Sequence, residues 1–373
     1  MTQVPPAPQQ PAMIASALTV DTIRAVGVEV PLAQPAITAA GTFTAFPIVL
    51  IDLHTVEGIV GRVYVFAYER LAVRPLIMLI EELGGLIKGH KLYPLAIAKL
   101  LQRRVRLLGA EGLMAMALGG IDMAVWDAVA RAANMPLAAY LGGEPRPIPA
   151  YRTLKSMTPD GAANDAIMAV RQGFSGVKLK LGGPTVADDV AIVRAVRGEV
   201  GDSVAIMADY NQVLSVTEAI ARCRALDDHD LVWIEEPTQA QDYAGHARIA
   251  SEARTPISLG ENWNGLADAA KSIAAEASDL IMPDAARIGG VTGWMHTAGL
   301  AAAHNIPLSG HALPELSLHL LTATPTAHWL EYADLVETIL REPMQIRDGC
   351  AMVPATPGFG IEWDAAALKR LIG

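Results

Sequence analysis

The chain has 373 residues, with 39 acidic and 29 basic side chains, a formal net charge of −10 and a pI of about 5.4. This acidic balance argues against nucleic acid and anionic membranes as partners, because both are negatively charged. The two cysteines lie in unrelated contexts, which excludes a disulfide framework and favours a reducing, cytoplasmic location. Hydrophobic residues make up 52% of the chain, which is typical of fully buried parallel strands, and we find no uninterrupted apolar run as long as a membrane span.

The first 147 residues divide into a tail and an α+β domain. Residues 1–18 are rich in Pro and Gln at their start and predict a flexible tail that is neither a secretory signal nor a transit peptide. Within residues 19–147, strand patterns come first and helical spacing follows, which favours an α+β domain. Between two strand patterns, residues 33–46 are small and rich in Gly and Thr, and we expect a mobile loop there.

After residue 148 the pattern changes to short apolar runs that alternate with alanine-rich, helix-length segments. Eight such units in series predict a closed parallel (β/α) barrel over residues 148–340. An open, doubly wound sheet is the alternative, but it usually has a Gly-rich turn after its first strand, which this chain lacks. The runs cover residues 148–154, 176–181, 204–211, 231–237, 256–262, 280–286, 306–312 and 328–333.

Each predicted strand from the second to the eighth carries an ionisable residue near its C-terminal end. The steps between these residues are 29, 26, 26, 23, 27 and 20 positions by subtraction, about one βα unit each. The C-terminal ends of barrel strands hold the active site, so seven residues in register predict an active site there. These residues are Lys180, Asp209, Glu235, Glu261, Asp284, His311 and Glu331.

Three of them, Asp209, Glu235 and Glu261, follow consecutive strands and predict a metal site. Carboxylates about 4 Å apart repel by roughly 4 kcal/mol per pair at an effective dielectric constant of 20, so some are protonated or a cation lies among them. Hard oxygen ligands on rigid strands favour Mg²⁺, with Mn²⁺ as a second choice. In the alternative interpretation each acid pairs with a neighbouring Lys or Arg. Glu236 should face the other side of the strand and form an ion pair.

Asp284 and His311 lie on neighbouring strands and are expected to touch. A buried carboxylate would orient the imidazole and raise its basicity, as a catalytic base requires; the alternative is a core histidine with backbone partners. Burial is expected to keep Glu331 protonated, so that it donates a hydrogen bond. Its alternative is a solvated acid at the rim of the barrel.

Several motifs carry a resemblance to a known family. The sequence resembles the enolase superfamily and, within it, the mandelate racemase subgroup, from about residue 20 to the C-terminus. The resemblance implies a capping domain at residues 19–147, a barrel of the modified TIM type and a C-terminal segment, 341–373, that returns to the cap. It also implies a homo-oligomer, octameric in the family, that abstracts the proton α to the carboxylate of a small substrate, with the enediolate held by Mg²⁺. The motifs are VKLKLG (177–182), DYNQ (209–212), WIEEPT (233–238), GEN (260–262), MPDAARIGGVTGW (282–294) and HLLTATPTAHWLE (319–331).

The resemblance assigns roles to the strand-end residues. Lys180 is the base on one face of the substrate carbon, and His311 with Asp284 is the base on the other. Lys178 lies beside the substrate carboxylate and the metal, and it stabilises the developing charge together with Glu331. The charge of Lys178 should also depress the pKa of Lys180, because neighbouring cations disfavour each other. Members specialised for muconate or N-acyl amino acids carry a lysine where this chain has Asp284, which favours the mandelate racemase subgroup.

The substrate-facing positions differ more from the family than the bases do. Thr153 replaces a serine near the substrate carboxylate, and Lys155, on the same face, points either into the pocket or into solvent. The segment over the substrate has Ala36, Ala40 and Phe43 where the family has valines, and Ala312 and Leu313 follow His311. Asn211, Phe43 and Tyr68 complete the expected substrate-binding set with Thr153 and Lys178. These changes favour racemisation of mandelate or a similar 2-hydroxy acid; an acid-sugar dehydratase and a non-catalytic binding protein are the alternatives.

Overall fold

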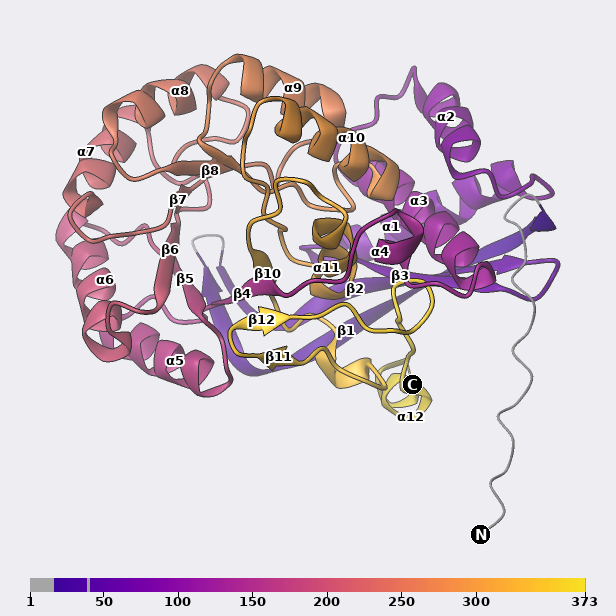
Figure 1. The fold of residues 1–373 in the computed structure, drawn as a ribbon, viewed down its shortest axis with the longest axis horizontal. Coiled ribbons are helices and arrows are strands. Elements are labelled where there is room, and N and C mark those ends of the chain that lie inside the picture. Colours follow the sequence, from indigo (N-terminus) through magenta and orange to yellow (C-terminus); the bar gives the residue numbers. More distant parts are fainter. Residues whose placement is uncertain (1–16, 39–40, 373) are drawn as a thin grey trace, which may run out of the picture.

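The computed structural model describes residues 17–38 and 41–372 of the chain. Figure 1 shows a cap, coloured indigo to purple, beside a barrel coloured magenta to orange. The last residues, in yellow, lie below the junction of these two parts. Of the predicted flexible tail, all but Ala17 and Leu18 lies outside the described residues, as does Ala40.

The cap begins with an antiparallel sheet in the order β1-β2-β3. Its strands are β1 (Val20–Thr38), β2 (Gly41–Thr55) and β3 (Val60–Phe66). The prediction of a loop over residues 33–46 is wrong for the described part of this segment, because residues 33–38 belong to β1 and residues 41–46 to β2, and Ala36 pairs with Phe43 after an irregularity that follows Pro31. The sequence GTFTAF explains the difference, since Thr and Phe favour extended backbone.

Four helices follow the sheet of the cap: α1 (Arg70–Ile87), α2 (Pro94–Val105), α3 (Leu113–Ala132) and α4 (Leu137–Tyr140). By length and composition alone, α3 is apolar enough to cross a membrane, and 78% of that stretch is buried inside the protein. It contacts α1 and β3 in the cap and α10 in the barrel. A Cβ on Gly119 would lie 1.9 Å from the carbonyl oxygen of Ala286, so this glycine lets α3 touch a loop of the barrel directly.

The barrel strands run parallel, and neighbours pair in chain order from β4 to β9. β10 pairs with β4, and parallel bridges of Leu308 to Ile281 and Ala327 fill the place between β9 and β10. Seven of the eight predicted strands therefore form regular strands, and the seventh run forms isolated bridges. The strands are β4 (Ile148–Thr153), β5 (Gly176–Lys180), β6 (Ala205–Asp209), β7 (Ile234–Glu235), β8 (Ile257–Leu259), β9 (Leu280–Ile281) and β10 (Leu330–Tyr332).

Amphipathic helices alternate with these strands, and those from α5 to α10 form the outer arc of the barrel in Figure 1. Side-chain caps fix the start of several: Thr185 and Asp188 form a capping box at α6, and the Ser215 side chain caps α7. The helices are α5 (Pro159–Arg171), α6 (Val186–Val200), α7 (Val216–Leu226), α8 (Tyr243–Glu252), α9 (Leu266–Ala274), α10 (Gly290–Ala303) and α11 (Pro314–Thr322).

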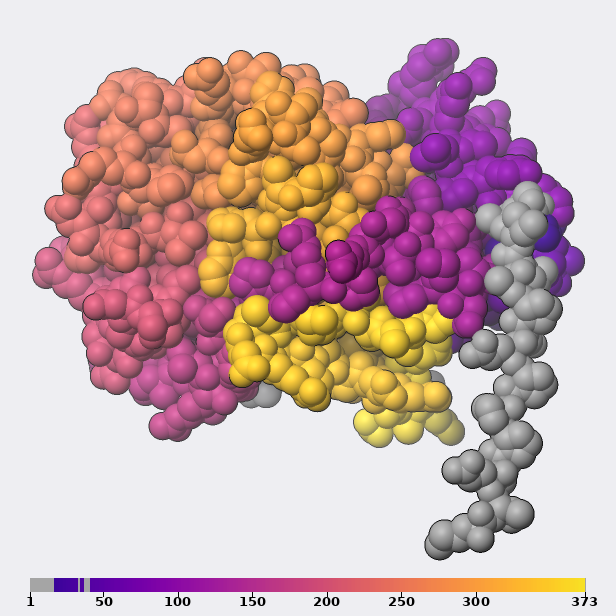
Figure 2. All heavy atoms as spheres, viewed as in Figure 1, coloured from indigo at the N-terminus to yellow at the C-terminus, as the bar shows by residue number. Residues whose placement is uncertain are grey.

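The C-terminal segment joins the two parts. β12 pairs antiparallel with β4, at the first strand of the barrel, and α12 contacts β1 of the cap. Glu362 binds Arg131 of the cap at 2.7 Å. Figure 2 shows this segment, in yellow, lying directly against the magenta part of the chain. Its elements are η2 (Glu337–Ile339), β11 (Ile346–Arg347), β12 (Cys350–Ala351) and α12 (Ala365–Ile372).

Candidate active site

The parallel register of the barrel brings the predicted strand-end residues together. Lys178 pairs with Thr153 on β4, Lys180 with Asp209 on β6, and Asp209 with Glu235 on β7. A parallel bridge also joins Asp284 to His311. Because the strands end at one rim, their last side chains converge there.

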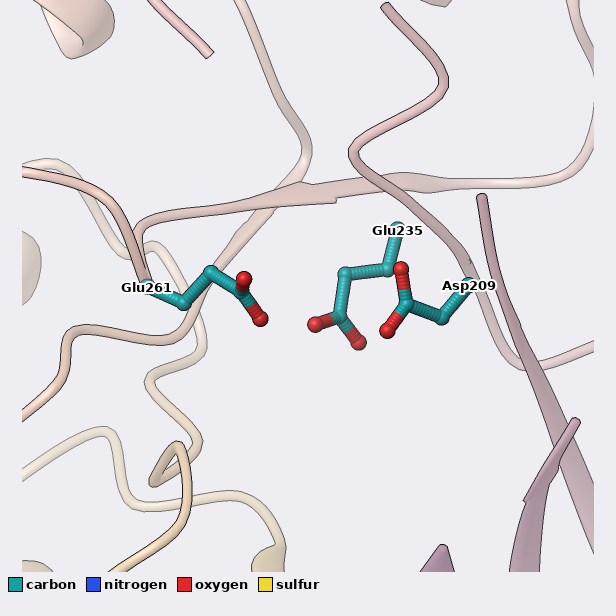
Figure 3. A group of neighbouring side chains, drawn as sticks. All are labelled: Asp209, Glu235 and Glu261. Carbon is teal, nitrogen blue, oxygen red and sulfur yellow. The ribbon is translucent and has the colours of Figure 1, made fainter. Parts of the chain in front are cut away.

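The three predicted metal ligands form one acidic cluster. Figure 3 shows the carboxylates of Asp209, Glu235 and Glu261 pointing toward one another, and one oxygen from each lies within 4.8 Å of the others. All three side chains are buried. Burial and the neighbouring Asp209 raise the pKa of Glu235 well above its ordinary value, against the opposing effect of Lys178. Three buried carboxylate oxygens on rigid strand ends are a donor set that fits Mg²⁺ or Mn²⁺.

Lys178 is the central cation of this site. Its ammonium, 1% exposed, contacts Glu235 at 3.0 Å and Glu331 at 2.8 Å. Burial lowers the pKa of Lys178, but Glu235 and Glu331 outweigh it and hold the pKa well above the ordinary value. The charged form of Lys178 is therefore favoured by its two carboxylate partners in the centre of the site.

Lys180 contacts Asp209 at 2.5 Å and donates to the amide oxygen of Asn211 at 3.0 Å. Burial lowers the pKa of Lys180, and the charge of Lys178 lowers it further, as the sequence predicted. The carboxylate of Asp209 outweighs both effects, so the pKa of Lys180 lies above its ordinary value. The prediction of a depressed pKa is therefore wrong for this arrangement. A divalent cation that shares Asp209 would weaken the effect of this carboxylate on Lys180.

His311 and Asp284 form the predicted pair, with Nδ1 of the imidazole 3.1 Å from Oδ2 of the carboxylate. On its other side, Nε2 lies 3.1 Å from Glu261. Burial lowers the pKa of His311, whereas Glu261 and the hydrogen bond with Asp284 raise it, and the net shift is upward. The imidazole thus lies between an orienting carboxylate and the acidic cluster.

Glu331 accepts hydrogen bonds from Thr153, Lys178 and the backbone N–H of Ala312. Burial raises the pKa of its carboxyl, but Lys178 and then His311 outweigh burial and hold the pKa below its usual range. The prediction of a protonated Glu331 that donates a hydrogen bond is therefore wrong for this arrangement, because a cation lies 2.8 Å away.

Glu236 does not face away from the site. Its φ of 39° lies in the left-handed region, and both of its oxygens accept hydrogen bonds from the Asn262 amide, at 2.9 and 2.7 Å. The predicted ion pair is therefore wrong, because the partner is an amide. Burial and then Glu261 raise the pKa of Glu236 well above its usual value. The same amide donates to Glu261 at 3.1 Å, so Asn262 links the two acids.

A cavity of about 310 Å³ opens above these groups. Cap residues form one side, which we call the cap wall, and barrel residues, most of them polar, form the other. Lys155 lines the cavity and pairs with Asp334 at 3.0 Å, which answers the open question of its direction. The cap wall consists of Ala36, Phe43, Phe46, Phe66 and Tyr68. The barrel side consists of Thr153, Leu154, Lys155, Lys180, Asn211, Gln212, Glu261, Asn262, Arg287, His311, Ala312, Glu331, Ala333, Asp334 and Leu335.

Sequence reasoning did not assign roles to Asn262 and Arg287. Arg287 donates to Asn262 at 2.7 Å, and its guanidinium lies 4.3 Å from the centre of the Tyr68 ring. Asn262 directly follows Glu261, and Arg287 lies three positions after Asp284, so both belong to motifs that were already identified. Their closeness to these acids in the sequence could have indicated a place in the site.

Family comparisons agree with this geometry. Residues 20–142 match the mandelate racemase / muconate lactonizing enzyme N-terminal domain, and residues 162–367 match the enolase C-terminal domain-like family. A capping domain and a (β/α) barrel with an acidic cluster at the strand ends define an enolase-superfamily protein. The chain belongs to the mandelate racemase / muconate lactonizing enzyme family, which confirms the predicted family and fold class.

Individual relatives differ in their names and in the ligands with which they were crystallised. L-talarate/galactarate dehydratase of Salmonella typhimurium is 35% identical over 256 residues, which are 68% of this chain and 64% of that protein, slightly under two thirds of its length. An enolase from Bradyrhizobium, crystallised with magnesium and mandelic acid, is 40% identical, with a TM-score of 0.90 over 95% of this chain and 98% of that one. L-talarate dehydratase from Polaromonas, crystallised with Mg and L-glucarate, is 31% identical. Its TM-score is 0.88, and the match covers 94% of this chain and 97% of that one.

Proposed function

We propose that the protein is a Mg²⁺-dependent racemase that moves the proton α to the carboxylate of mandelate or a similar 2-hydroxy acid. The observation that carries the proposal is that Lys180 and His311 line one cavity together with Glu261 of the acidic cluster. The two bases come from the second and seventh positions of the barrel, with the metal-binding strands between them. A substrate held at the cluster would therefore meet a base on each face.

Proton transfer uses the chain's own groups. The neutral amine of Lys180 takes the α-proton of one enantiomer, and the electron pair of the C–H bond moves into the carboxylate to give an enediolate. The protonated imidazole of His311 then returns a proton to the opposite face, and the reverse reaction exchanges these roles. Bound Mg²⁺ supplies positive charge that stabilises the additional negative charge on the substrate. Lys178 adds a second fixed positive charge in the same place.

The cap wall supports an apolar or aromatic side group on the substrate. Phe43, Phe46 and Phe66 line the cavity, and the Phe46 ring lies 5.3 Å from Phe66 in an edge-on arrangement. Aromatic faces attract an aryl ring but give sugar hydroxyls no partners, and each unpaired buried polar group costs about 1 to 3 kcal/mol. The Bradyrhizobium enolase with mandelic acid adds support.

Dehydration of an acid sugar is the second candidate. The names of several relatives favour it, and so do the polar groups on the barrel side, since Gln212, Asn262 and Lys155 can bind hydroxyl or carboxylate groups. In this reaction one base removes the α-proton, and the conjugate acid of the other protonates the departing β-hydroxyl group.

One panel of substrates separates the two candidates. Purified protein with Mg²⁺ is incubated with each enantiomer of mandelate, with other 2-hydroxy acids and with sugar acids. Polarimetry detects racemisation, and a 2-keto acid assay detects dehydration. We expect racemisation of mandelate or another aryl 2-hydroxy acid. Dehydration of a sugar acid without any racemisation would assign the protein to the dehydratases.

A further inference from the structure

One residue of the cap reaches a catalytic pair of the barrel. Tyr68 lies between β3 and α1, and its hydroxyl donates to Oδ2 of Asp284 at 3.2 Å. Its φ is 62°, in the left-handed region that costs a non-glycine residue free energy unless the surroundings hold it. The backbone of the cap is thus held in an unfavourable conformation at the point where it contacts this pair.

The hydrogen bonds of Asp284 are fully assigned. Its Oδ1 accepts from the backbone N–H groups of Ala286 at 2.8 Å and Arg287 at 3.0 Å. Its Oδ2 accepts from the Tyr68 hydroxyl and lies 3.1 Å from Nδ1 of His311. An ionised carboxylate only accepts, so Nδ1 must carry a hydrogen; whenever His311 is neutral, its lone pair is therefore on Nε2, the nitrogen 3.1 Å from Glu261. The four bonds fix both the carboxylate and the tautomer of the base.

Packing fixes the Tyr68 ring as well. Its centre lies 4.4 Å from that of Phe66, and the Arg287 guanidinium lies 4.3 Å from it. The ring is parallel to the His311 imidazole, at 4° and 6.5 Å between centres. Arg287 is itself anchored to Asn262 at 2.7 Å. The hydroxyl therefore has little freedom to leave Asp284.

Among the described residues, the cap gives the other base no such support. The polar contacts of Lys180 in the described part of the chain are Asp209 and Asn211, and both belong to the barrel. The two bases thus differ in what holds them. Lys180 depends on barrel residues, whereas His311 depends on Asp284, a barrel carboxylate that Tyr68 of the cap helps to orient.

From this asymmetry we propose that Tyr68 is a positioning residue for His311 and has no part in proton transfer at Lys180. The inference rests on the proposed two-base function. Removal of the hydroxyl leaves one lone pair of Asp284 unfilled and lets the carboxylate turn, so the imidazole loses its fixed direction. Loss of an outer partner that orients a metal-ligating histidine typically costs about 10- to 100-fold in metal affinity or activity, and we expect a loss of similar size for this catalytic histidine.

The test is Tyr68→Phe, which keeps the ring and removes only the hydroxyl. The Mg²⁺-loaded enzyme is incubated in D₂O with each enantiomer separately, and exchange of the α-proton is followed by NMR. His311→Asn and Lys180→Ala identify which enantiomer each base handles. We expect exchange at His311 to fall about 10-fold or more, whereas exchange at Lys180 and the KM change less than about twofold. Tyr332→Phe is the matched control, because its hydroxyl donates to Glu337, outside the cavity, and we expect no change.

An equal loss for both enantiomers, or no loss for either, overturns the inference. A wild-type enzyme that exchanges no α-proton of any acid in the panel refutes the proposed function instead. In that case the inference is decided on the resting protein, by the ¹⁵N resonances of the His311 ring, assigned with the His311→Asn variant. A defined tautomer in wild type that becomes mixed in Tyr68→Phe supports positioning, and identical spectra overturn it.

Discussion

The two sides of the cavity are built from different chemistry. On the barrel side, Lys180, His311 and Glu331 are ionisable and line the cavity, and Lys178 behind them contacts Glu235 and Glu331. On the cap wall, Phe43 and Phe66 offer apolar surface, and the Tyr68 hydroxyl points to Asp284. The barrel groups stand on parallel strand ends, whereas Phe43 stands near the end of a long antiparallel hairpin. Under the proposed function, the reaction depends mainly on the barrel and the fit of the substrate's side group mainly on the apolar part of the cap wall, with Tyr68 as the cap residue that reaches the catalytic pair.

Damage to the barrel side should have the largest effect. Glu235→Gln keeps the shape of the side chain but removes a charged ligand from the acidic cluster, and EDTA should act in the same way. Because metal charge stabilisation is worth several kcal/mol, we expect a loss of about 10³-fold or more in kcat. Activity is measured across a Mg²⁺ titration, with Glu218→Gln on the outside of α7 as the control. Full activity in the chelated enzyme would contradict the metal site.

The two bases should be separable, at a somewhat smaller cost. Lys180→Ala and His311→Asn should each reduce racemisation by about 10²- to 10⁴-fold, the usual contribution of a general base. In D₂O, each variant should still exchange the α-proton of one enantiomer through the remaining base. Racemisation at the wild-type rate in either variant would refute the two-base mechanism.

The sequence predicted the residues at the strand ends of the barrel better than it predicted the contacts of individual side chains. Asp209 and Glu261 could be assigned to the active-site end of the barrel, because strand alternation and the βα repeat are visible in the local sequence. The parallel register of the strands then brings these two side chains close to each other. The direction of Glu236 could not be predicted, since it depends on a left-handed backbone that alternation along a strand does not foresee. Tyr68 was expected at the substrate pocket, but its hydrogen bond to Asp284, made from a left-handed backbone, was not. The charge state of Glu331 also escaped prediction, because it depends on a lysine 153 positions away in the chain, by subtraction from Lys178.

On the cap wall, Phe43→Ala should change binding and leave the chemistry intact. Loss of an aromatic surface against an aryl substrate costs about 1.5 kcal/mol or more, so we expect the KM for mandelate to rise about 10-fold at nearly constant kcat. Lactate is the matched control substrate, because its methyl group is too short to use this surface to the same extent. A drop in kcat with an unchanged KM would show that Phe43 takes part in the reaction itself.

The smallest effect is expected for Lys155, a charged barrel residue that lines the cavity and could also contact the side group of the substrate. Lys155 and Arg152 both contact Asp334, at 3.0 and 3.1 Å, so Asp334 keeps a cation if either one is removed. For a substrate with an aryl group we expect Lys155→Met to change kcat/KM less than about threefold, because a partly exposed ion pair contributes at most about 1 kcal/mol. A dicarboxylic sugar acid should lose about 10-fold or more, because a hydrogen bond to a charged group contributes about 1.5 to 3 kcal/mol. Arg152→Met is the matched control: this guanidinium lies over the rings of Phe174 and Tyr332, away from the cavity. If mandelate turnover fell as strongly as that of the sugar acid, Lys155 would hold the carboxylate that all substrates share, and the barrel side would also determine substrate choice.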